Sequence, residues 1–443
     1  MADTSLGAYS DPNTTPPMGQ AIPLGAQHVL AMFASNVTPS IIVAGAAGLA
    51  FGGAEQVYLI QMAMLFAGIA TLFQTVGVGP IGSRLPIMQG TSFAFVGVLA
   101  GIAATQGLGV ALTACIIGGV IHFLLGSVIQ NLRFLFPPLV TGLVILAIGL
   151  YLIPVAIKYA AGGAASFQME AESFGSLKHW SVALTVIVVS LILKFFTKGI
   201  LSMAAILIGL LAGYTLAFAL GMVNFAAVGK ASWITSIQPL PYGFKFNLGA
   251  VIAVTLISIV SAIETVGDAS ATIKAGAGRE ATDEEIAGAT YADGLGTSVA
   301  GVFGGLPNTS FSQNVGIIGM TCVMSRHVVT IAGVIMIVCG LVPKIGALIA
   351  SMPLPVLGGG VIVMFGMVAA AGLNVLAEEK MTRRTMIIII AVSLEFGLGL
   401  NLVPTAVQYL PGVVKTLAIS AVAPTALMAI VLNLVLPQEM DEA

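Results

Sequence analysis

A pair of carboxylates within an apolar stretch is the first feature of the sequence that could do chemistry. Glu264 and Asp268 are four residues apart, which places both on one face of a helix. Two neighbouring carboxylates disfavour joint ionisation, a property that suits a group that takes up and releases a proton. Charges at bilayer depth are costly and mark functional sites. We therefore expect both residues to bind a ligand or to take part in coupling. The alternative for Asp268 is that it only marks the cytoplasmic end of its helix.

Two further carboxylates and two histidines also interrupt apolar segments. Asp293, in Tyr-Ala-Asp-Gly-Leu-Gly, suits either a coupling role or the cap of a broken helix. His28 follows Gly-Ala-Gln and suits either a coupling role or a buried, satisfied histidine. His122 and Glu395 lie on otherwise apolar segments, so we expect them to be polar residues that pack between helices.

The composition shows which environment must hold these side chains. The 443 residues include 16 Lys and Arg and 18 Asp and Glu, so 8% are charged and 58% are apolar. Soluble domains carry roughly 25% charged residues, which excludes a water-exposed globular enzyme. The net charge of −2 offers no basic surface for nucleic acid. The three cysteines, Cys115, Cys322 and Cys339, are scattered and predict neither a disulfide framework nor a metal site.

The apolar runs predict an all-α polytopic membrane protein. A helix needs about 20 apolar residues to cross the hydrocarbon, and the chain contains roughly fourteen such segments. Those around Phe95, Ser298 and Val315 are rich in Gly, Ser, Thr and Pro, so we expect broken elements buried in protein. Residues 1–20 lack a signal peptide and are predicted to be a cytoplasmic tail. Ten of the sixteen cationic residues then fall in cytoplasmic connections, which favours a cytoplasmic N-terminus.

Two pairs of segments indicate an internal repeat. The stretch 138–149 matches 355–366 at an offset of 217, and Thr-Ser-Phe at 91–93 matches Thr-Ser-Phe at 309–311 at an offset of 218. Each repeat would contain half of the fourteen segments, which is seven. Because seven is odd, the second repeat would start on the opposite side of the membrane from the first. The predicted units are an inverted pair, 21–222 and 244–437, joined by an extracellular or periplasmic connection at 223–243. Inverted repeats with paired broken helices are typical of secondary transporters.

The stretch 307–321 contains Gln313-Asn-Val-Gly, then four intervening residues and Thr321, and resembles the signature of the nucleobase-ascorbate transporter family. Glu264, Asp268 and Asp293, together with Gln27-His28, extend the resemblance over nearly the whole chain. It implies fourteen spans, with short strands in the third and tenth. It also implies a core domain, built from segments 1–4 and 8–11, and a gate domain, built from segments 5–7 and 12–14. Cys322 departs from the Arg, Lys or Gly usual in the family.

The resemblance also implies a site. Glu264 and Gln313 would bind the edge of a base through their side chains, backbone groups near Phe93 and Ser312 would complete the contact, and the Phe93 ring would stack. Carboxylate and amide together match the alternating donors and acceptors of a purine-dione. Further residues assigned by the resemblance are Ser92 and Asn314 near the substrate, and His28, Asp268 and Asp293 for proton coupling or for holding the core together.

We therefore expect a proton symporter of oxidised purines, xanthine or urate, in the cell inner or plasma membrane. It would work by an elevator movement, as a homodimer in the bilayer, with the proton as coupling ion and with neither a metal nor another cofactor. Gln313 favours purines, and uracil is the alternative substrate. An intramembrane aspartyl protease using Asp268 and Asp293 is a rival, although Thr265 stands where its Gly-x-Gly-Asp pattern needs the first Gly. A channel is the third alternative.

Overall fold

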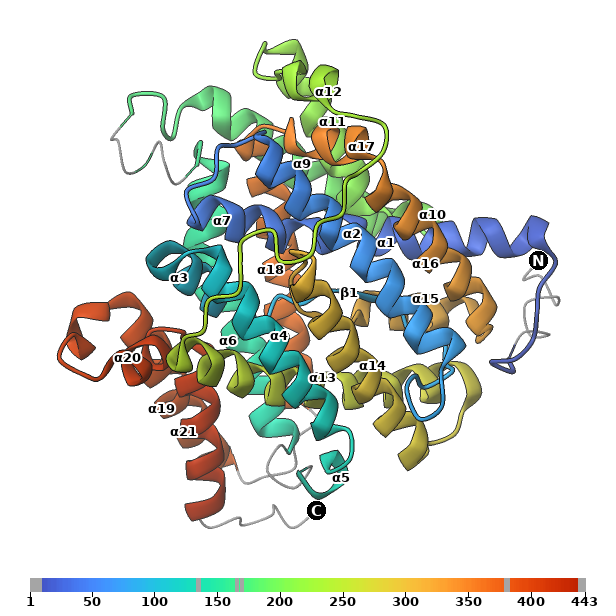
Figure 1. Cartoon of the computed structure of the whole chain (residues 1–443), viewed down its shortest axis with the longest axis vertical. Helices are drawn as coiled ribbons and strands as arrows, with labels where there is room; N and C mark the ends of the chain where they lie inside the picture. Colours follow the sequence, from blue (N-terminus) through green and yellow to red (C-terminus); the bar gives the residue numbers. More distant parts are fainter. Residues whose placement is uncertain (1–9, 133–136, 164–166, 168–170, 378–382, 437–443) are drawn as a thin grey trace.

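The computed structural model describes residues 10–132, 137–163, 167, 171–377 and 383–436, which are mostly helical (Figure 1). The first half contains α1 (Met18–Ala46), α2 (Ala54–Val76), β1 (Gln89–Thr91), α3 (Val96–Gln106), α4 (Leu108–Leu125), α5 (Ile129–Leu132), α6 (Pro138–Tyr151), α7 (Ile153–Ala160), α9 (Leu177–Phe196), α10 (Ile200–Met203), α11 (Ala205–Ala219) and α12 (Ala226–Lys230). The second half contains α13 (Leu248–Ala277), α14 (Asp283–Val302), β2 (Asn308–Ser310), α15 (Ser312–Thr321), α16 (Arg326–Leu341), α17 (Pro343–Ala350), α18 (Leu354–Ala377), α19 (Arg383–Leu402), α20 (Gly412–Ala418) and α21 (Val422–Val435).

Many of these helices have the length and composition of membrane spans. Within the described residues, eight are long and apolar enough, or nine when α16 and α17 count as one span bent by 79°. Three shorter apolar helices, α3, α11 and α21, add to them. The chain is therefore a multi-pass membrane protein. The count of fourteen segments stays a prediction.

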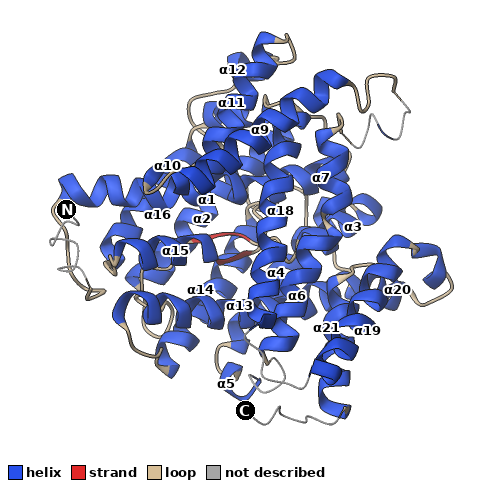
Figure 2. Cartoon of the chain, turned by 180° about the vertical axis from the view of Figure 1, so that it is seen from behind, coloured by secondary structure: helices blue, strands red, loops and turns tan. Residues whose placement is uncertain are grey.

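The two short strands lie where the sequence predicts broken elements near Phe95 and Val315. They pair antiparallel, with Gln89 opposite Ser310 and Thr91 opposite Asn308, and we call this pair the ribbon. All six of its residues are buried, and Figure 2 shows the ribbon enclosed by helices. Backbone bonds from Ser92 to Pro307 and from Phe311 to Met88 extend it at both ends. The backbone released by the breaks is thus paired within the protein, as lipid requires.

The third predicted break, centred near Ser298, is wrong, because α14 is continuous. Its start is stabilised by a capping box in which Thr282 Oγ1 accepts from the Glu285 N–H at 3.2 Å and the Glu285 carboxylate accepts from the Thr282 N–H at 2.8 Å. The break comes after Val302, at Gly304, where φ is +86°. Asp293 lies in the middle of α14, so the prediction that it caps a broken helix is also wrong.

Helices of the first half of the chain pack against helices of the second half. Helix α2 of the first half packs on α16 of the second, and α14 of the second packs on α4 of the first. Glycines permit both contacts: a Cβ on Gly68 would lie 2.5 Å from the Gly333 carbonyl oxygen, and one on Gly119 would lie 2.5 Å from Ser298 Oγ. A third pair, α6 and α18, also joins the two halves and is contacted by α9, α19 and α21.

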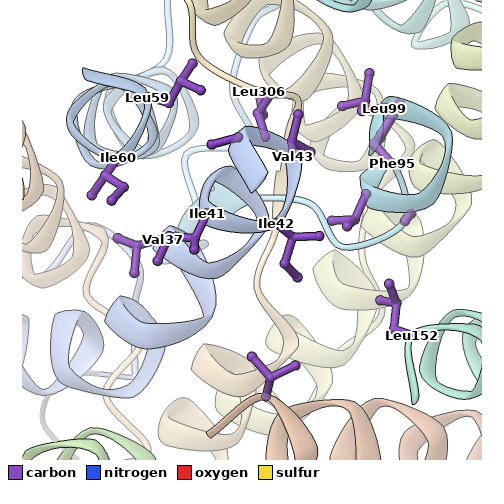
Figure 3. Packing of buried hydrophobic residues seen from close by; sticks show 14 of the residues in the cluster. Val37, Ile41, Ile42, Val43, Leu59, Ile60, Phe95, Leu99, Leu152 and Leu306 are labelled. Carbon is purple, nitrogen blue, oxygen red and sulfur yellow. The ribbon is translucent and has the colours of Figure 1, made fainter. Parts of the chain in front are cut away.

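The largest apolar cluster draws buried residues from many helices of both halves of the chain, and one part of it lies where α1, α2 and α3 meet. Figure 3 shows Ile41 and Ile42 of α1 among Ile60 of α2, Phe95 before α3 and Leu152. All five side chains are buried. This packing holds the chain that leaves β1, because Phe95, four residues after Thr91, is fully buried in the cluster.

The contact between α2 and α16 yields a stability prediction. Replacing Gly68 with Ala should force the two backbones apart and lower the free energy of unfolding by about 1–3 kcal/mol, the usual cost of overpacking. Thermal unfolding of the purified protein in detergent measures the loss. Gly101→Ala on α3 is the control, since no atom lies within 4 Å of its added Cβ, and its melting temperature should not fall. Equal melting temperatures for Gly68→Ala and the parent protein would contradict the close approach.

Candidate functional site

A cavity of about 260 Å³ lies between the ribbon and the α6–α18 pair. One side, the polar wall, consists of residues 91–94, Glu264 and residues 309–313. The opposite side, the apolar wall, consists of Ile145 and Ile148 of α6 and Met367, Val368 and Ala371 of α18. All hydrogen-bonding side chains of the cavity therefore come from one wall. Such a division suits a flat ligand whose polar edge meets the polar wall.

Glu264 reaches the cavity from the middle of α13. Its side chain is partly exposed, and its carboxylate accepts no hydrogen bond from the described residues. A carboxylate without an internal partner is available for two donors of a ligand. Gln313, on the first turn of α15, lines the same cavity and adds an amide with both donors and an acceptor.

The aromatic and hydroxyl residues expected near the substrate also reach the cavity. Phe93, Ser92 and Ser312 all line it. The Phe93 ring meets Phe365 of α18 edge to face, with centroids 5.3 Å apart, so it already joins the two walls. The Ser92 hydroxyl accepts from the Ala94 N–H at 3.3 Å. Helix α15 begins here without a side-chain cap, and the Asn314 N–H donates to the Phe311 carbonyl oxygen at 2.9 Å, so the N–H groups of Ser312 and Gln313 are the ones left to serve as donors.

Asp268 holds the second strand of the ribbon. It is buried, and its two oxygens accept from Ser310 Oγ at 2.7 Å and from Ser312 Oγ at 2.8 Å. The alternative that Asp268 marks the cytoplasmic end of its helix is wrong, because α13 continues to Ala277. The side chain acts on the ribbon and on the start of α15, while the cavity itself is lined by its neighbour Glu264.

Asp293 holds the first strand. Its Oδ1 accepts from Gln89 Nε2 at 2.7 Å and from Gln74 Nε2 at 3.1 Å, and its Oδ2 accepts from the Thr265 hydroxyl. Gln89 and Ser310 are partners in register, so each side of one strand pair is bound to a different buried aspartate. Among the described residues the one ion pair joins Arg279 and Glu285. Neither aspartate is therefore paired with a cation, and both accept hydrogen bonds from neutral donors instead.

The separate partners of the two aspartates also bear on the protease alternative. A proteolytic pair needs both carboxylates within reach of one water. Here Asp268 is occupied by two serines and Asp293 by two glutamines and a threonine. The two side chains thus serve different strands and do not form a shared catalytic pair.

His28 and Asn314 bind each other away from the cavity. Asn314 Nδ2 lies 3.0 Å from His28 Nδ1 and 3.0 Å from the His28 carbonyl oxygen, and both side chains are buried. Neither residue lines the cavity. The contact joins α15 to α1. His122 is buried within α4, as expected of a packing residue, whereas Glu395 is exposed on α19 and does not pack between helices.

Sequence reasoning missed several polar residues on the helices around the ribbon. Asn36 Oδ1 accepts from the Thr91 N–H at 2.8 Å, and its Nδ2 donates to the Ala63 carbonyl at 3.1 Å, so it joins α1, α2 and β1. Gln74 and Thr265 join the same network through Asp293. An amide within an apolar helix is the one signal that could have found Asn36 and Gln74. Among the described residues, no three His, Cys, Asp or Glu side chains are placed to hold a metal ion.

The two hydrogen bonds of Asp268 predict that its replacement will loosen strand β2. In Asp268→Asn a single amide oxygen replaces two carboxylate oxygens, so one serine hydroxyl loses its acceptor, at a cost of about 1.5–3 kcal/mol. Hydrogen exchange of the backbone amides at 308–310 should become faster, and the melting temperature should fall. Asp283→Asn, on the exposed first turn of α14, is the matched control and should change neither. Unchanged exchange at 308–310 in Asp268→Asn would show that Asp268 does not hold the strand.

Known proteins resemble this chain over almost its full length. The model of the Permease family matches residues 19–406. The uric acid permease PucK of Bacillus subtilis is 37% identical, with 94% of this chain and 95% of the relative covered. The xanthine permease of the same organism is 34% identical, with 94% of each covered. The uric acid transporter UacT of Escherichia coli is 36% identical, with 94% and 86% covered.

Solved structures show a related fold at lower sequence identity. The transmembrane domain of the cyanobacterial bicarbonate transporter BicA has a TM-score of 0.59 at 14% identity, with 95% of this chain and 98% of that chain covered. The murine anion transporter Slc26a9, in its inward-facing state, has a TM-score of 0.62 at 12% identity, with 95% and 69% covered. The family match and the relatives above 30% identity place this chain in the Permease family, confirm its resemblance to the nucleobase-ascorbate transporters and make it a transporter rather than an enzyme.

Proposed function

We propose that the protein is a proton symporter of oxidised purine bases, xanthine or urate, that works by an elevator movement. The observation that carries the proposal is the meeting of Glu264 and Gln313 on the polar wall of one cavity. A purine-dione presents a row of N–H donors and C=O acceptors along its edge. The carboxylate accepts two N–H groups, and the amide supplies a donor beside an acceptor.

The relatives support this substrate class. The two similar proteins of Bacillus subtilis are a xanthine permease and a uric acid permease, and the one of Escherichia coli is a uric acid transporter. Phe93 adds a ring at the edge of the cavity for contact with the face of a base. The Ser92 hydroxyl, on the same wall, offers a polar contact for the additional oxygen that distinguishes urate from xanthine.

The two walls support movement of one part of the chain against the other. The polar wall is built on the ribbon, α13 and α15, and the apolar wall on α6 and α18. An apolar surface makes no directional bonds, so the ribbon side is able to slide along it with the substrate bound. The exchange of partners, α2 with α16 and α14 with α4, supports inverted repeats at 21–222 and 244–437. We assign the ribbon helices to the core domain and the α6–α18 side to the gate.

The coupling ion in this proposal is a proton. Glu264, Asp268 and Asp293 are carboxylates within an apolar chain, and neutral donors surround the two aspartates. A proton taken up by such a group removes its charge before the core moves through a region of low dielectric. The protein would act in the cell inner or plasma membrane as a homodimer, with its N-terminus in the cytoplasm.

Uptake by cells without their own purine carriers tests the proposal. Cells producing the protein should accumulate radiolabelled xanthine or urate, and a protonophore should abolish the accumulation. Uptake that a protonophore leaves unchanged would contradict proton symport. Unlabelled uracil, added in excess, should compete less well than xanthine or urate; stronger competition by uracil would make it the substrate.

A pair of variants tests the role of Glu264. Glu264→Gln places an N–H donor against the N–H donors of the base, so uptake should fall about tenfold or more, as expected when a hydrogen bond to a charged group worth about 1.5–3 kcal/mol is lost. Glu395→Gln makes the same change on an exposed side chain of α19 and should transport like the parent protein. Normal xanthine uptake by Glu264→Gln would remove this residue from the binding site.

A further inference from the structure

Three hydroxyl groups form a chain between the cavity and Asp293. Ser261 Oγ donates to Thr309 Oγ1 at 3.2 Å, Thr309 Oγ1 lies 3.5 Å from Thr265 Oγ1, and the Thr265 hydroxyl donates to Asp293 Oδ2. All four side chains are buried. Ser261 and Thr265 are one helical turn apart on α13, and Thr309 belongs to β2. This series of hydrogen bonds thus runs from the ribbon to α14 through side chains of α13.

The hydroxyl protons along this route have an arrangement in which each points toward the carboxylate. Because Ser261 donates its proton to Thr309, the proton of Thr309 is free to point at Thr265. The Thr265 hydroxyl has two acceptors within reach, the Ser261 carbonyl oxygen at 3.1 Å and the nearer Asp293 Oδ2, to which it donates in this arrangement. A hydroxyl both donates and accepts, so it is able to pass a proton on. The other oxygen, Oδ1, is bound by the amides of Gln74 and Gln89, which donate without releasing a proton.

One end of the chain reaches the site of transport. Thr309 lines the cavity, whereas Thr265 and Asp293 do not. Both of these residues are fully buried. Among the described residues, the Oδ2 atom of Asp293 therefore has one hydroxyl neighbour, and that neighbour leads to the cavity.

We propose that Thr309 and Thr265 form the route by which a proton passes between the substrate cavity and Asp293. The inference rests on the proposed function of proton-coupled transport. On uptake, the Thr265 proton moves to Asp293 Oδ2 and the Thr309 proton moves to Thr265 Oγ1. Thr309 Oγ1 then takes a proton from hydronium in the cavity, which leaves water. Each hydroxyl ends with one proton and the carboxylate becomes neutral; release runs in reverse.

Few titratable groups surround this route. The elements packed against α14 are α2, α4, α13 and β2. Their acidic, basic, Tyr and Cys residues are Glu55 and Tyr58 of α2, Cys115 and His122 of α4, and Glu264, Asp268 and Lys274 of α13, while β2 has none. Glu264 lines the cavity and Asp268 is bound by two serines. The route therefore connects the cavity to Asp293, a second carboxylate besides Glu264, which lines the cavity itself.

Reconstituted liposomes separate proton movement from substrate movement. Two rates are measured: net xanthine uptake driven by an inward proton gradient, and exchange of labelled for unlabelled xanthine at equal pH, in which no proton must leave the protein. In Thr265→Val, net uptake should fall at least about tenfold, the scale of a lost proton-transfer group, while exchange stays within about twofold. Thr265→Ser keeps the hydroxyl and should restore net uptake.

Two further variants keep the test decisive. Thr272→Val removes a buried hydroxyl of α13 that has no hydrogen-bond partner among the described residues, and both of its rates should match the parent protein. Thr309→Val interrupts the route at the cavity without touching Asp293. Because Thr309 also lines the cavity, its readout is the ratio of net uptake to exchange, which should fall at least about tenfold, as in Thr265→Val.

The outcomes distinguish this inference from the proposed function. Gradient-driven uptake by the parent protein together with normal net uptake in Thr265→Val and Thr309→Val would overturn the route alone. Parallel loss of uptake and exchange in both variants, or failure of Thr265→Ser to restore uptake, would overturn it as well. Absence of gradient-driven uptake in the parent protein would instead overturn proton symport itself.

Discussion

The structure depends on how two buried carboxylates are satisfied in a nearly charge-free interior. An ionised carboxylate in an apolar medium is very costly unless donors surround it. Asp268 and Asp293 obtain those donors from the ribbon and its neighbours, Asp268 from Ser310 and Ser312, and Asp293 from Gln89 among others. The ribbon has only three residues in each strand. It is therefore held in place by these aspartates as much as by its own backbone bonds.

The cavity follows from that arrangement. With both strands bound to helices α13 and α14, the residues just beyond the strands, including Phe93 and Gln313, are set at fixed positions on one wall. Glu264 shares a helix face with Asp268, so the helix that anchors the ribbon also brings its carboxylate to the cavity. The groups proposed for binding and for coupling are thus built on the same few elements, and a change in the charge of either aspartate would act directly on the polar wall.

The opposite wall has a different physical character. Ile148 and Met367 represent a surface of α6 and α18 that makes no directional contact with a ligand. Glycine-permitted packing, such as that of Gly142 against Gly372, keeps these two helices close together. One wall therefore offers hydrogen-bonding groups, while the other offers an apolar surface.

The sequence by itself determined the membrane environment and the family, and it predicted five residues that line the cavity, Ser92, Phe93, Glu264, Ser312 and Gln313. Charge scarcity and apolar runs are properties of composition, and the motif at Gln313 is local. Tertiary structure alone decided the partners of the polar side chains. Asn314 was expected beside the substrate and instead binds His28, and Asp293 was considered a helix cap and instead joins three elements. Hydrogen bonds between Thr265 and Asp293, or Gln89 and Asp293, join residues 28 and 204 positions apart. No local pattern encodes such pairings, because they depend on how the helices pack.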